Sequence, residues 1–229
     1  MLMKKMSGNN DPQDIHDPKD YWDHRFDEYA FHHSRQNNYI ASDFLSRVPS
    51  NAKFAETFGS AQSLLEVGCG TGEFCQLVAK QYPQMKRLVG TDISEEGIQY
   101  GRRRNKFQDR VQYEVFNSLS RPGGFAELGQ FDLALCSNVL EHFTDPYPLI
   151  EQMLDAAKTV CILVPYNHLS EDTSLTGDGG EGHVFRFTEQ SFDRYDLSAT
   201  FRFQSKGWSN VTNHPDPWQL AVLIRRKRS

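Results

Sequence analysis

Three glycines at alternate positions, directly after an apolar run that ends near an acid, are the residues best suited to hold a small ligand. Gly68, Gly70 and Gly72 follow Glu66 along the chain. Such a turn lets a ligand lie against backbone N–H groups, because no Cβ blocks the approach. A dinucleotide fingerprint needs a small residue at position 73, where this chain has glutamate, and a carboxylate at position 66 would repel a pyrophosphate. The loop therefore favours a cationic ligand, such as an ammonium or a sulfonium, over NAD.

Polar residues also follow three later apolar runs. Asp92 ends the first of these runs, and a carboxylate there can accept hydrogen bonds from both ribose hydroxyls of a nucleoside. Asn117 and Ser118 follow the second run, and the segment Ser137–His142 follows the third. In open α/β sheets the ligand lies beyond the carboxyl ends of the strands, so we expect these residues to converge in space.

The order Glu-x-Gly-x-Gly-x-Gly after a strand, with a second acid ending the next strand, resembles the first two motifs of class I S-adenosylmethionine (SAM)-dependent methyltransferases. The stretch Phe131–His142 resembles the fourth strand of that family and the turn after it. Gly182–Thr188 resembles a segment of the ubiquinone-biosynthesis-like branch of small-molecule methyltransferases. The resemblance covers roughly residues 62–224. It implies SAM as the cofactor and methyl transfer to an oxygen or nitrogen of a small-molecule acceptor.

The resemblance also implies which residues bind the cofactor. The glycine loop and Glu66 would hold the methionine part, Asp92 the ribose, and Ile93 would pack on the adenine. Many relatives have Asp after the third strand for the adenine amino group; Asn117 stands there in this chain, and its amide oxygen can still accept. The expected cofactor-binding residues are Glu66, Gly68, Cys69, Gly70, Gly72, Asp92, Ile93, Asn117, Ser118, Ser137 and Asn138.

Methyl transfer depends mainly on alignment, and a base is needed only if the acceptor atom carries a proton. His142 and His183 are the candidate catalytic residues, and His214 and Tyr166 are further candidates. The alternative for each of the two histidines is a side chain that only shapes the pocket through hydrogen bonds. The expected acceptor pocket consists of Tyr21, Trp22, Glu141, Phe143, Tyr147 and Tyr166. No metal site is expected, because the four cysteines lack Cys-x-x-Cys spacing and no cluster of acids with an amide is evident.

The sequence divides into three regions. Residues 1–17 are polar and are expected to be disordered. Residues 18–60 form a helical arm, in which one helix carries the Tyr21–Trp22–Phe26 stripe and a second helix holds Tyr39–Leu45. Residues 61–229 form the SAM-binding domain. The glycine-rich stretch 169–182 is either a lid over the site or disordered.

Within the third region, apolar strands alternate with amphipathic helices, which predicts right-handed crossovers and a parallel sheet. The segment around Phe201 and Phe203 alternates with period two, as does Trp218–Ile224, and together they predict an antiparallel hairpin. The expected fold is therefore α/β: a Rossmann-like class I methyltransferase sheet, mostly parallel, with a C-terminal antiparallel strand and a helical N-terminal arm. The strands are expected at 63–67, 87–91, 111–116, 131–136 and 159–164, and the helices at 72–81, 94–106 and 146–157.

Composition restricts the partners. The formal net charge of −5 argues against nucleic acid, and no apolar run is long enough to cross a membrane. Four cysteines without a disulfide pattern indicate a reducing, cytoplasmic environment. A monomer or homodimer acting on a small molecule is expected. One alternative is a catalytically silent SAM-fold protein that acts as a partner or regulatory subunit. The presence of both acids and the glycine loop argues against it, because a silent domain need not keep them. The other alternative is an NAD-linked oxidoreductase. A nucleic-acid methyltransferase lacks support, because no Asn/Asp-Pro-Pro-aromatic motif is present.

Overall fold

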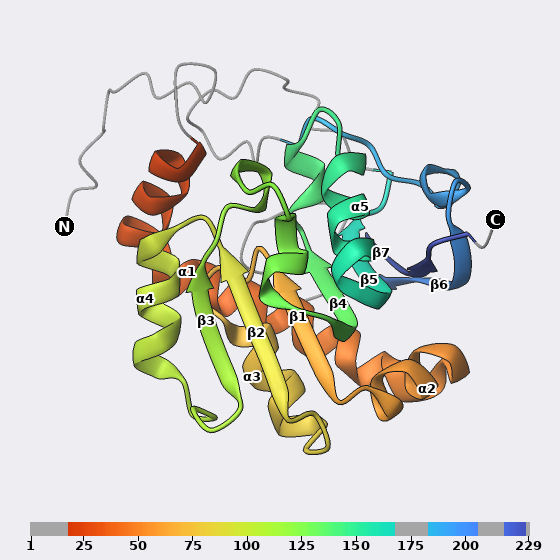
Figure 1. The fold of residues 1–229 in the computed structure, drawn as a ribbon, viewed down its shortest axis with the longest axis horizontal. Coiled ribbons are helices and arrows are strands. Elements are labelled where there is room, and N and C mark those ends of the chain that lie inside the picture. The colour runs from red at the N-terminus through yellow and green to blue at the C-terminus, as the bar shows by residue number, and fades with distance from the viewer. Residues whose placement is uncertain (1–17, 168–182, 206–217, 228–229) are drawn as a thin grey trace.

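The computed structural model describes residues 18–167, 183–205 and 218–227 (Figure 1). The expectations for residues 1–17, for the glycine-rich stretch 169–182 and for His214 therefore lie outside the described residues.

Within the described part of the chain, seven strands form one sheet in the order β3-β2-β1-β4-β5-β7-β6. The strands from β1 to β5 pair in parallel, whereas β7 is antiparallel to both β5 and β6. This arrangement confirms the predicted mostly parallel sheet with an antiparallel C-terminal strand. The strands are β1 (Ser63–Val67), β2 (Arg87–Asp92), β3 (Val111–Val115), β4 (Phe131–Ser137), β5 (Ala157–Pro165), β6 (Asp196–Gln204) and β7 (Trp218–Arg225).

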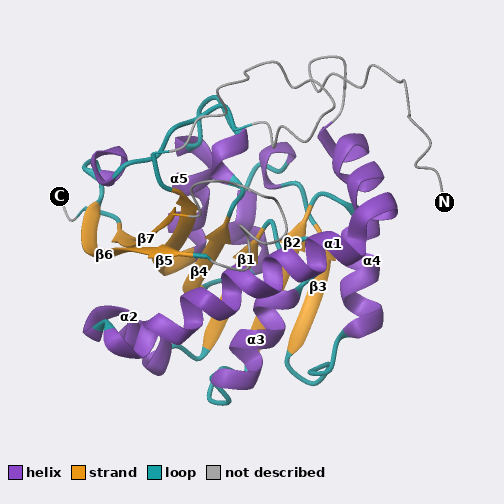
Figure 2. Ribbon diagram, turned by 180° about the vertical axis from the view of Figure 1, so that it is seen from behind, coloured by secondary structure: helices purple, strands orange, loops and turns teal. Residues whose placement is uncertain are grey.

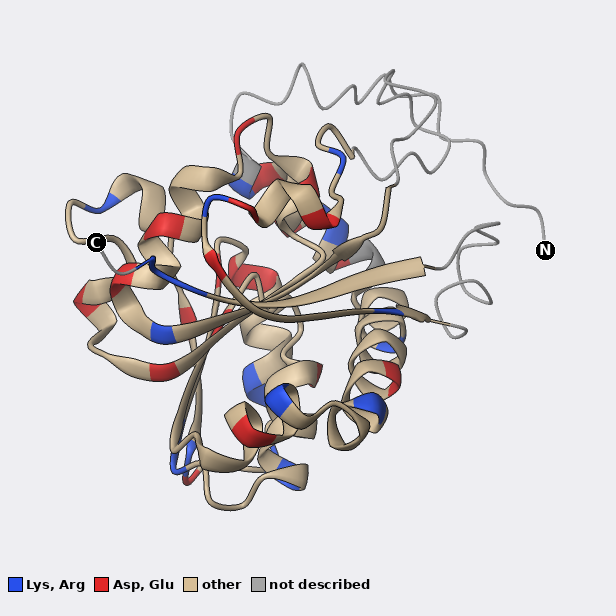
Figure 3. Ribbon diagram, turned by 90° about the vertical axis from the view of Figure 1, so that its right-hand side faces the viewer, with Lys and Arg blue, Asp and Glu red and all other residues tan. Residues whose placement is uncertain are grey.

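Helices cover both faces of the sheet. The helices are α1 (Pro18–Arg47), α2 (Ala52–Ser60), α3 (Glu73–Gln81), α4 (Glu95–Arg104) and α5 (Tyr147–Ala156). Figure 2 shows α1 running across one face of the sheet beside α2 and α3, and α5 lies on the opposite face. Acidic and basic residues are interspersed over the outer helices and loops, and the view in Figure 3 shows no face of a single sign. Among the described helices, none is both long and apolar enough to span a bilayer.

The side chains of β1 alternate between two hydrophobic cores. Leu64 packs in the core on the side of α1–α3, whereas Leu65 and Val67 pack in the core on the side of α5. This alternation follows from the two-residue period of a strand. It places Glu66 on the same side as Leu64, facing α3.

The arm contains one long helix before α2, where the sequence predicted two separate helices. Helix α1 runs without interruption for 30 residues, which gives it a length of about 45 Å. No proline or glycine occurs after Pro18 in this helix, and two consecutive asparagines at 37 and 38 cost only about 1 kcal/mol of helix propensity together. The prediction of two separate helices was therefore wrong, because nothing in this stretch interrupts the helix.

Helix α4 begins where the sequence predicted. The hydroxyl of Ser94 accepts a hydrogen bond from the Gly97 N–H at 3.1 Å, and Glu95 and Glu96 occupy the first turn. Three arginines, at 102–104, occupy the last turn. Acids at the start and bases at the end of a helix both interact favourably with its dipole.

Candidate functional site

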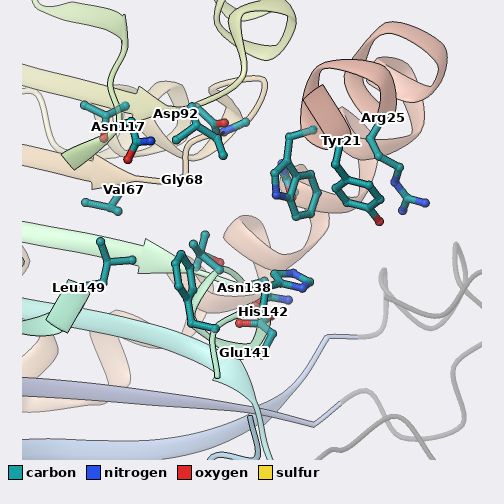
Figure 4. A pocket seen from close by; sticks show the side chains of 18 of the residues that line it. Tyr21, Arg25, Val67, Gly68, Asp92, Asn117, Asn138, Glu141, His142 and Leu149 are labelled. Carbon is teal, nitrogen blue, oxygen red and sulfur yellow. Dashed lines mark hydrogen bonds between the residues drawn. The ribbon is translucent and has the colours of Figure 1, made fainter. Parts of the chain in front are cut away.

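A cavity of about 410 Å³ lies at the carboxyl ends of β1, β2 and β4, with residues of α1 along one side (Figure 4). In the sheet, β2 and β3 lie on one side of β1, whereas β4 and β5 lie on its other side. The direction of strand order therefore switches between β1 and β4. Ligands of open α/β sheets bind at this kind of switch point. The volume lies within the usual range for small-molecule sites.

The glycine loop forms one wall of the cavity and connects β1 to α3. Gly68 has a φ of +69° and Gly72 a φ of +81°, both in the left-handed region that glycine tolerates best. A Cβ on Gly68 would lie 2.3 Å from a methyl carbon of Val139, and a Cβ on Gly72 would lie 2.5 Å from the Tyr113 ring. Both glycines are therefore required by backbone conformation and by close packing.

Asp92 ends β2 and connects it to the glycine loop. Its carboxylate accepts hydrogen bonds from the N–H groups of Gly70 at 2.8 Å and Ser94 at 2.9 Å. Burial raises the pKa of Asp92, and the N–H donors from Ser94, Gly70 and Ile93 partly oppose this rise. Asp92 is 9% exposed and lines the cavity, as do Gly68 and Gly70. The structure thus brings together the glycine loop and the second acid, which are distant in sequence.

The next part of the wall comes from the residues that follow β2 and β3. Ile93 follows β2, Asn117 and Ser118 follow β3, and all three line the cavity. The Asn117 amide oxygen accepts the Leu119 N–H at 3.2 Å and so caps a 3₁₀ turn. Because an amide oxygen has two lone pairs, this cap leaves Asn117 able to accept a second hydrogen bond from a ligand.

Three expected cofactor-binding residues do not reach the cavity wall: Glu66, Cys69 and Gly72. Glu66 faces away because side chains alternate along β1, and it accepts the Cys75 N–H at 2.9 Å in the first turn of α3. Burial raises the pKa of Glu66 to about 8. Glu66 therefore supports the start of α3 through this hydrogen bond and does not line the cavity.

The opposite wall follows β4. Ser137, Asn138, Glu141, His142 and Phe143 line the cavity together with His183. Figure 4 shows Glu141 and His142 across the pocket from Asp92 and Asn117. The two candidate catalytic histidines are neighbours, since their ring centroids are 5.3 Å apart. The sequence predicted no metal ligands, yet Glu141, His142 and His183 place one ligand atom each within 4.8 Å of one another.

Of the expected aromatic residues, Tyr21, Trp22 and Phe143 line the cavity, whereas Tyr147 and Tyr166 do not. The Tyr147 hydroxyl donates to the Ser191 carbonyl at 3.2 Å, and the Arg194 guanidinium lies 3.8 Å from the centre of its ring. The Tyr166 ring lies beneath Arg202. Tyr147 thus packs against the segment that precedes β6 and Tyr166 packs against β6 itself, and sequence spacing alone gave no sign of this packing.

Helix α1 contributes cavity residues that the sequence analysis missed. They are Arg25, Phe26, His33, Gln36, Asn37 and Ile40. These positions continue the Tyr21–Trp22 stripe at helical spacing, so one uninterrupted helix would have predicted them. Dividing the arm into two helices hid this signal.

Hydrogen bonds hold α1 over the site. Asp23 accepts from the Ser94 hydroxyl at 2.7 Å and from the Glu96 N–H at 3.3 Å, and it pairs with Lys19. Burial alone would raise the pKa of Asp23, but the hydrogen bonds from Lys19 and Ser94 outweigh it and lower the value. Further along, the Ser34 hydroxyl donates to the buried Glu73 in the first turn of α3. The arm is thus fastened to both α3 and α4.

Comparison with known proteins gives one family. The family model described as a methyltransferase domain matches residues 65–162. Ajmaline N-methyltransferase from Rauvolfia serpentina is 28% identical over 49% of this chain and 38% of its own length. Ubiquinone biosynthesis O-methyltransferase from Psychrobacter cryohalolentis is 26% identical over 70% of this chain and 59% of its own length. The chain thus spans about two fifths to three fifths of the length of these curated relatives.

Among solved structures, a SAM-dependent methyltransferase from Anabaena variabilis superimposes with a TM-score of 0.65. Its identity is 15%, and the alignment covers 98% of this chain and 100% of the other. This likeness confirms the fold. The glycine loop and the strand order agree with the match of residues 65–162 to a methyltransferase domain.

Proposed function

We propose that this chain is an enzyme that transfers the methyl group of SAM to an oxygen or nitrogen of a small-molecule acceptor. The observation that carries the proposal is the cavity, which has the glycine loop and Asp92 on one wall and Glu141, His142 and His183 on the other. A cofactor on the first wall would present its reactive group toward the second wall. The relatives that methylate small molecules support this acceptor class.

The residues present fit the proposed cofactor. Gly68 and Gly70 expose backbone to the cavity, so the methionine part can lie against it without meeting a side chain. Asp92 borders the cavity as a carboxylate that can accept from ribose hydroxyls. Asn117 retains an acceptor lone pair for the adenine amino group. The rings of Phe116 and Phe125 stack with centroids 5.7 Å apart and form an apolar wall for the adenine ring.

When bound, SAM supplies a methyl group on a sulfonium, which an acceptor lone pair attacks while the carbon–sulfur bond breaks and its electrons return to sulfur. The protein has to align the acceptor and exclude water, and orientation contributes much of the rate. Trp22 packs edge-on against His142, with ring centroids 5.3 Å apart, and so closes the cavity between α1 and the turn after β4. Glu141, His142 and His183 are the groups on the acceptor wall that would assist removal of a proton from the acceptor.

We also propose that the enzyme works in a reducing compartment such as the cytoplasm. All four cysteines are free and buried. Burial raises the pKa of the Cys69 and Cys75 thiols well above the usual value, which keeps them protonated and unreactive.

Asp92 gives the test of this function. S-adenosylhomocysteine (SAH) should bind the native chain in isothermal calorimetry, and NADH should not. Asp92→Asn should weaken SAH binding about 10–100-fold, because a charge-assisted hydrogen bond contributes about 1.5–3 kcal/mol. Asp92→Ala should weaken it further, since it also removes the partner of the Gly70 N–H.

The matched control is Asp109→Asn, which changes an exposed aspartate away from the cavity and should leave SAH affinity unchanged. Binding of NADH without SAH would contradict the proposal and favour the oxidoreductase. SAH binding that survives in Asp92→Ala would show that the ligand lies elsewhere.

A further inference from the structure

The turn after β4 and the segment that precedes β6 bring two imidazoles and one carboxylate to a single point of the cavity wall. The ligand atoms of Glu141, His142 and His183 all lie within 4.8 Å of one another. The distance from His183 Nε2 to Glu141 Oε1 is 3.9 Å. Glu141 is 1% exposed and His183 is 4% exposed, so the cluster is largely shielded from solvent yet borders the cavity.

The backbone holds these donors in place. Asn138 adopts a left-handed conformation with a φ of +53°, and its N–H donates to the Leu163 carbonyl at 2.9 Å. The chain then enters the 3₁₀ turn that carries Glu141 and His142. The Glu141 carbonyl accepts the N–H groups of Val184 at 2.8 Å and Phe185 at 3.1 Å, which fixes the segment next to His183.

Aromatic contacts hold the two imidazoles. The His142 ring packs edge-on against both Trp22 and His183, each with centroids 5.3 Å apart. Backbone hydrogen bonds and aromatic contacts thus support the cluster from three segments. Support of this kind holds metal ligands close to their binding geometry.

The donor set indicates the kind of ion. Two imidazoles with one carboxylate are typical of catalytic sites for zinc and related transition metals, which leave further coordination positions open to water or substrate. Magnesium prefers oxygen ligands, and this cluster has nitrogen at two of three positions. Bond lengths of 2.0–2.2 Å place tetrahedral ligand atoms about 3.4 Å apart, so the donors, which lie within 4.8 Å of one another, would need to approach by about 1.4 Å at most.

We propose that Glu141, His142 and His183 bind a divalent transition-metal ion of the zinc type, and that this ion receives a hydroxyl-bearing acceptor. The metal site stands on the cluster alone, whereas its role rests on the proposed methyl transfer. The ion polarises the acceptor O–H, whose proton passes to water. The oxygen lone pair then bonds to the methyl carbon, the carbon–sulfur bond breaks, and its electron pair stays on sulfur. The acceptor class is thereby narrowed to oxygen nucleophiles such as phenols.

The test measures metal binding on the full chain, prepared without a histidine tag and treated with a chelator. Zn²⁺ should bind at one ion per chain in calorimetry, and Co²⁺ should produce visible absorption bands that Zn²⁺ removes and excess Mg²⁺ does not. Glu141→Gln and His183→Gln should each weaken Zn²⁺ binding at least about 10-fold and abolish the Co²⁺ bands, since losing even an outer-shell partner costs 10–100-fold.

The matched control is His32→Gln, which removes an exposed histidine of α1 outside the cavity and should leave the Zn²⁺ affinity and the Co²⁺ bands unchanged. Circular dichroism checks that each variant is folded, and His142→Gln replaces any variant that is not. Zn²⁺ binding that is absent, or that persists at full affinity in the folded cluster variants, would overturn the metal site.

SAH binding separates this inference from the proposed function. If the native chain binds SAH but no Zn²⁺, the methyltransferase assignment stands and only the metal site fails. If it binds Zn²⁺ through the cluster but no SAH, the metal site stands and the role in methyl transfer fails.

Discussion

Glu66 is a buried acid at the end of β1 whose ionisation the fold opposes. Its carboxyl accepts the Cys75 N–H, but burial dominates and raises its pKa to about 8. An unfolded glutamate loses its proton near pH 4.3. Between these two values the native state holds one proton more than the unfolded state, so the free energy of unfolding decreases as pH rises.

Glu66→Gln should remove this dependence. The amide oxygen can still accept the Cys75 N–H, and the side chain no longer ionises. In ligand-free protein, the variant should lose less stability than the native chain between pH 5 and pH 8, by up to about 1.4 kcal/mol per pH unit. Urea unfolding at several pH values measures the difference.

The control is Glu56→Gln, because Glu56 is exposed and its lysine neighbour lowers its pKa. This variant should keep the slope of the native chain between pH 5 and pH 8. Parallel slopes for Glu66→Gln and the native chain would show that burial does not control the ionisation of Glu66.

Helix α1 contacts both walls of the cavity, the one that we propose for the cofactor and the one that we propose for the acceptor. It reaches the glycine loop through Phe26, which lies close to Gly70, and it reaches the turn after β4 through Trp22. Its hydrogen bonds to α3 and α4 hold the helix in the position that makes these contacts. The helix therefore acts as a wall of the site as well as a packing element.

Trp22→Ala should weaken SAH binding about tenfold, because it removes an aromatic wall of the cavity and admits water. The melting temperature should change little, because the Trp22 side chain is only half-buried. Calorimetry and a thermal melt give the two values. Phe31→Ala in the same helix is the control, because Phe31 is 59% exposed and outside the cavity. Unchanged SAH affinity in Trp22→Ala would assign α1 to stability alone.

At the scale of the whole molecule, the arm and the sheet share one core. Phe44 of α1 is fully buried and packs against aromatic rings from α2, α3 and β6, with centroids 5.8–6.0 Å apart: Phe54, Phe58, Phe74, Phe201 and Phe203. An arm attached in this way should unfold together with the sheet, because separating it would expose the same side chains.

Phe44→Ala should lower the free energy of unfolding by about 3–5 kcal/mol, the usual cost of removing a buried phenylalanine. Circular dichroism and tryptophan fluorescence should report one coincident transition in the native chain. Tyr39→Ala, which changes a 38% exposed residue of the same helix, should cost much less. Two separate transitions in the native chain would show that the arm is an independent unit.

The fold followed closely from local patterns. The alternation of strands with helices predicted the parallel sheet, the helix expected at 94–106 matched the start of α4, and the Glu-x-Gly-x-Gly-x-Gly spacing predicted the loop. These features depend on neighbours within a few residues. Sequence also identified Gly68, Gly70, Asp92, Asn117 and His142, all of which line the cavity, since strand ends of a parallel sheet meet at one edge.

Only the tertiary structure decided the other features of the site. The two-residue period of the strand turns Glu66 away from the cavity. Tyr147 packs against the segment before β6 and Tyr166 against β6, so neither side chain lines the cavity. The approach of His183 to Glu141 and His142 depends on hydrogen bonds between segments far apart in the chain. Residue types and spacing determined what chemistry the chain carries, whereas long-range packing determined which of those groups face one another, because no local pattern encodes distances between distant segments.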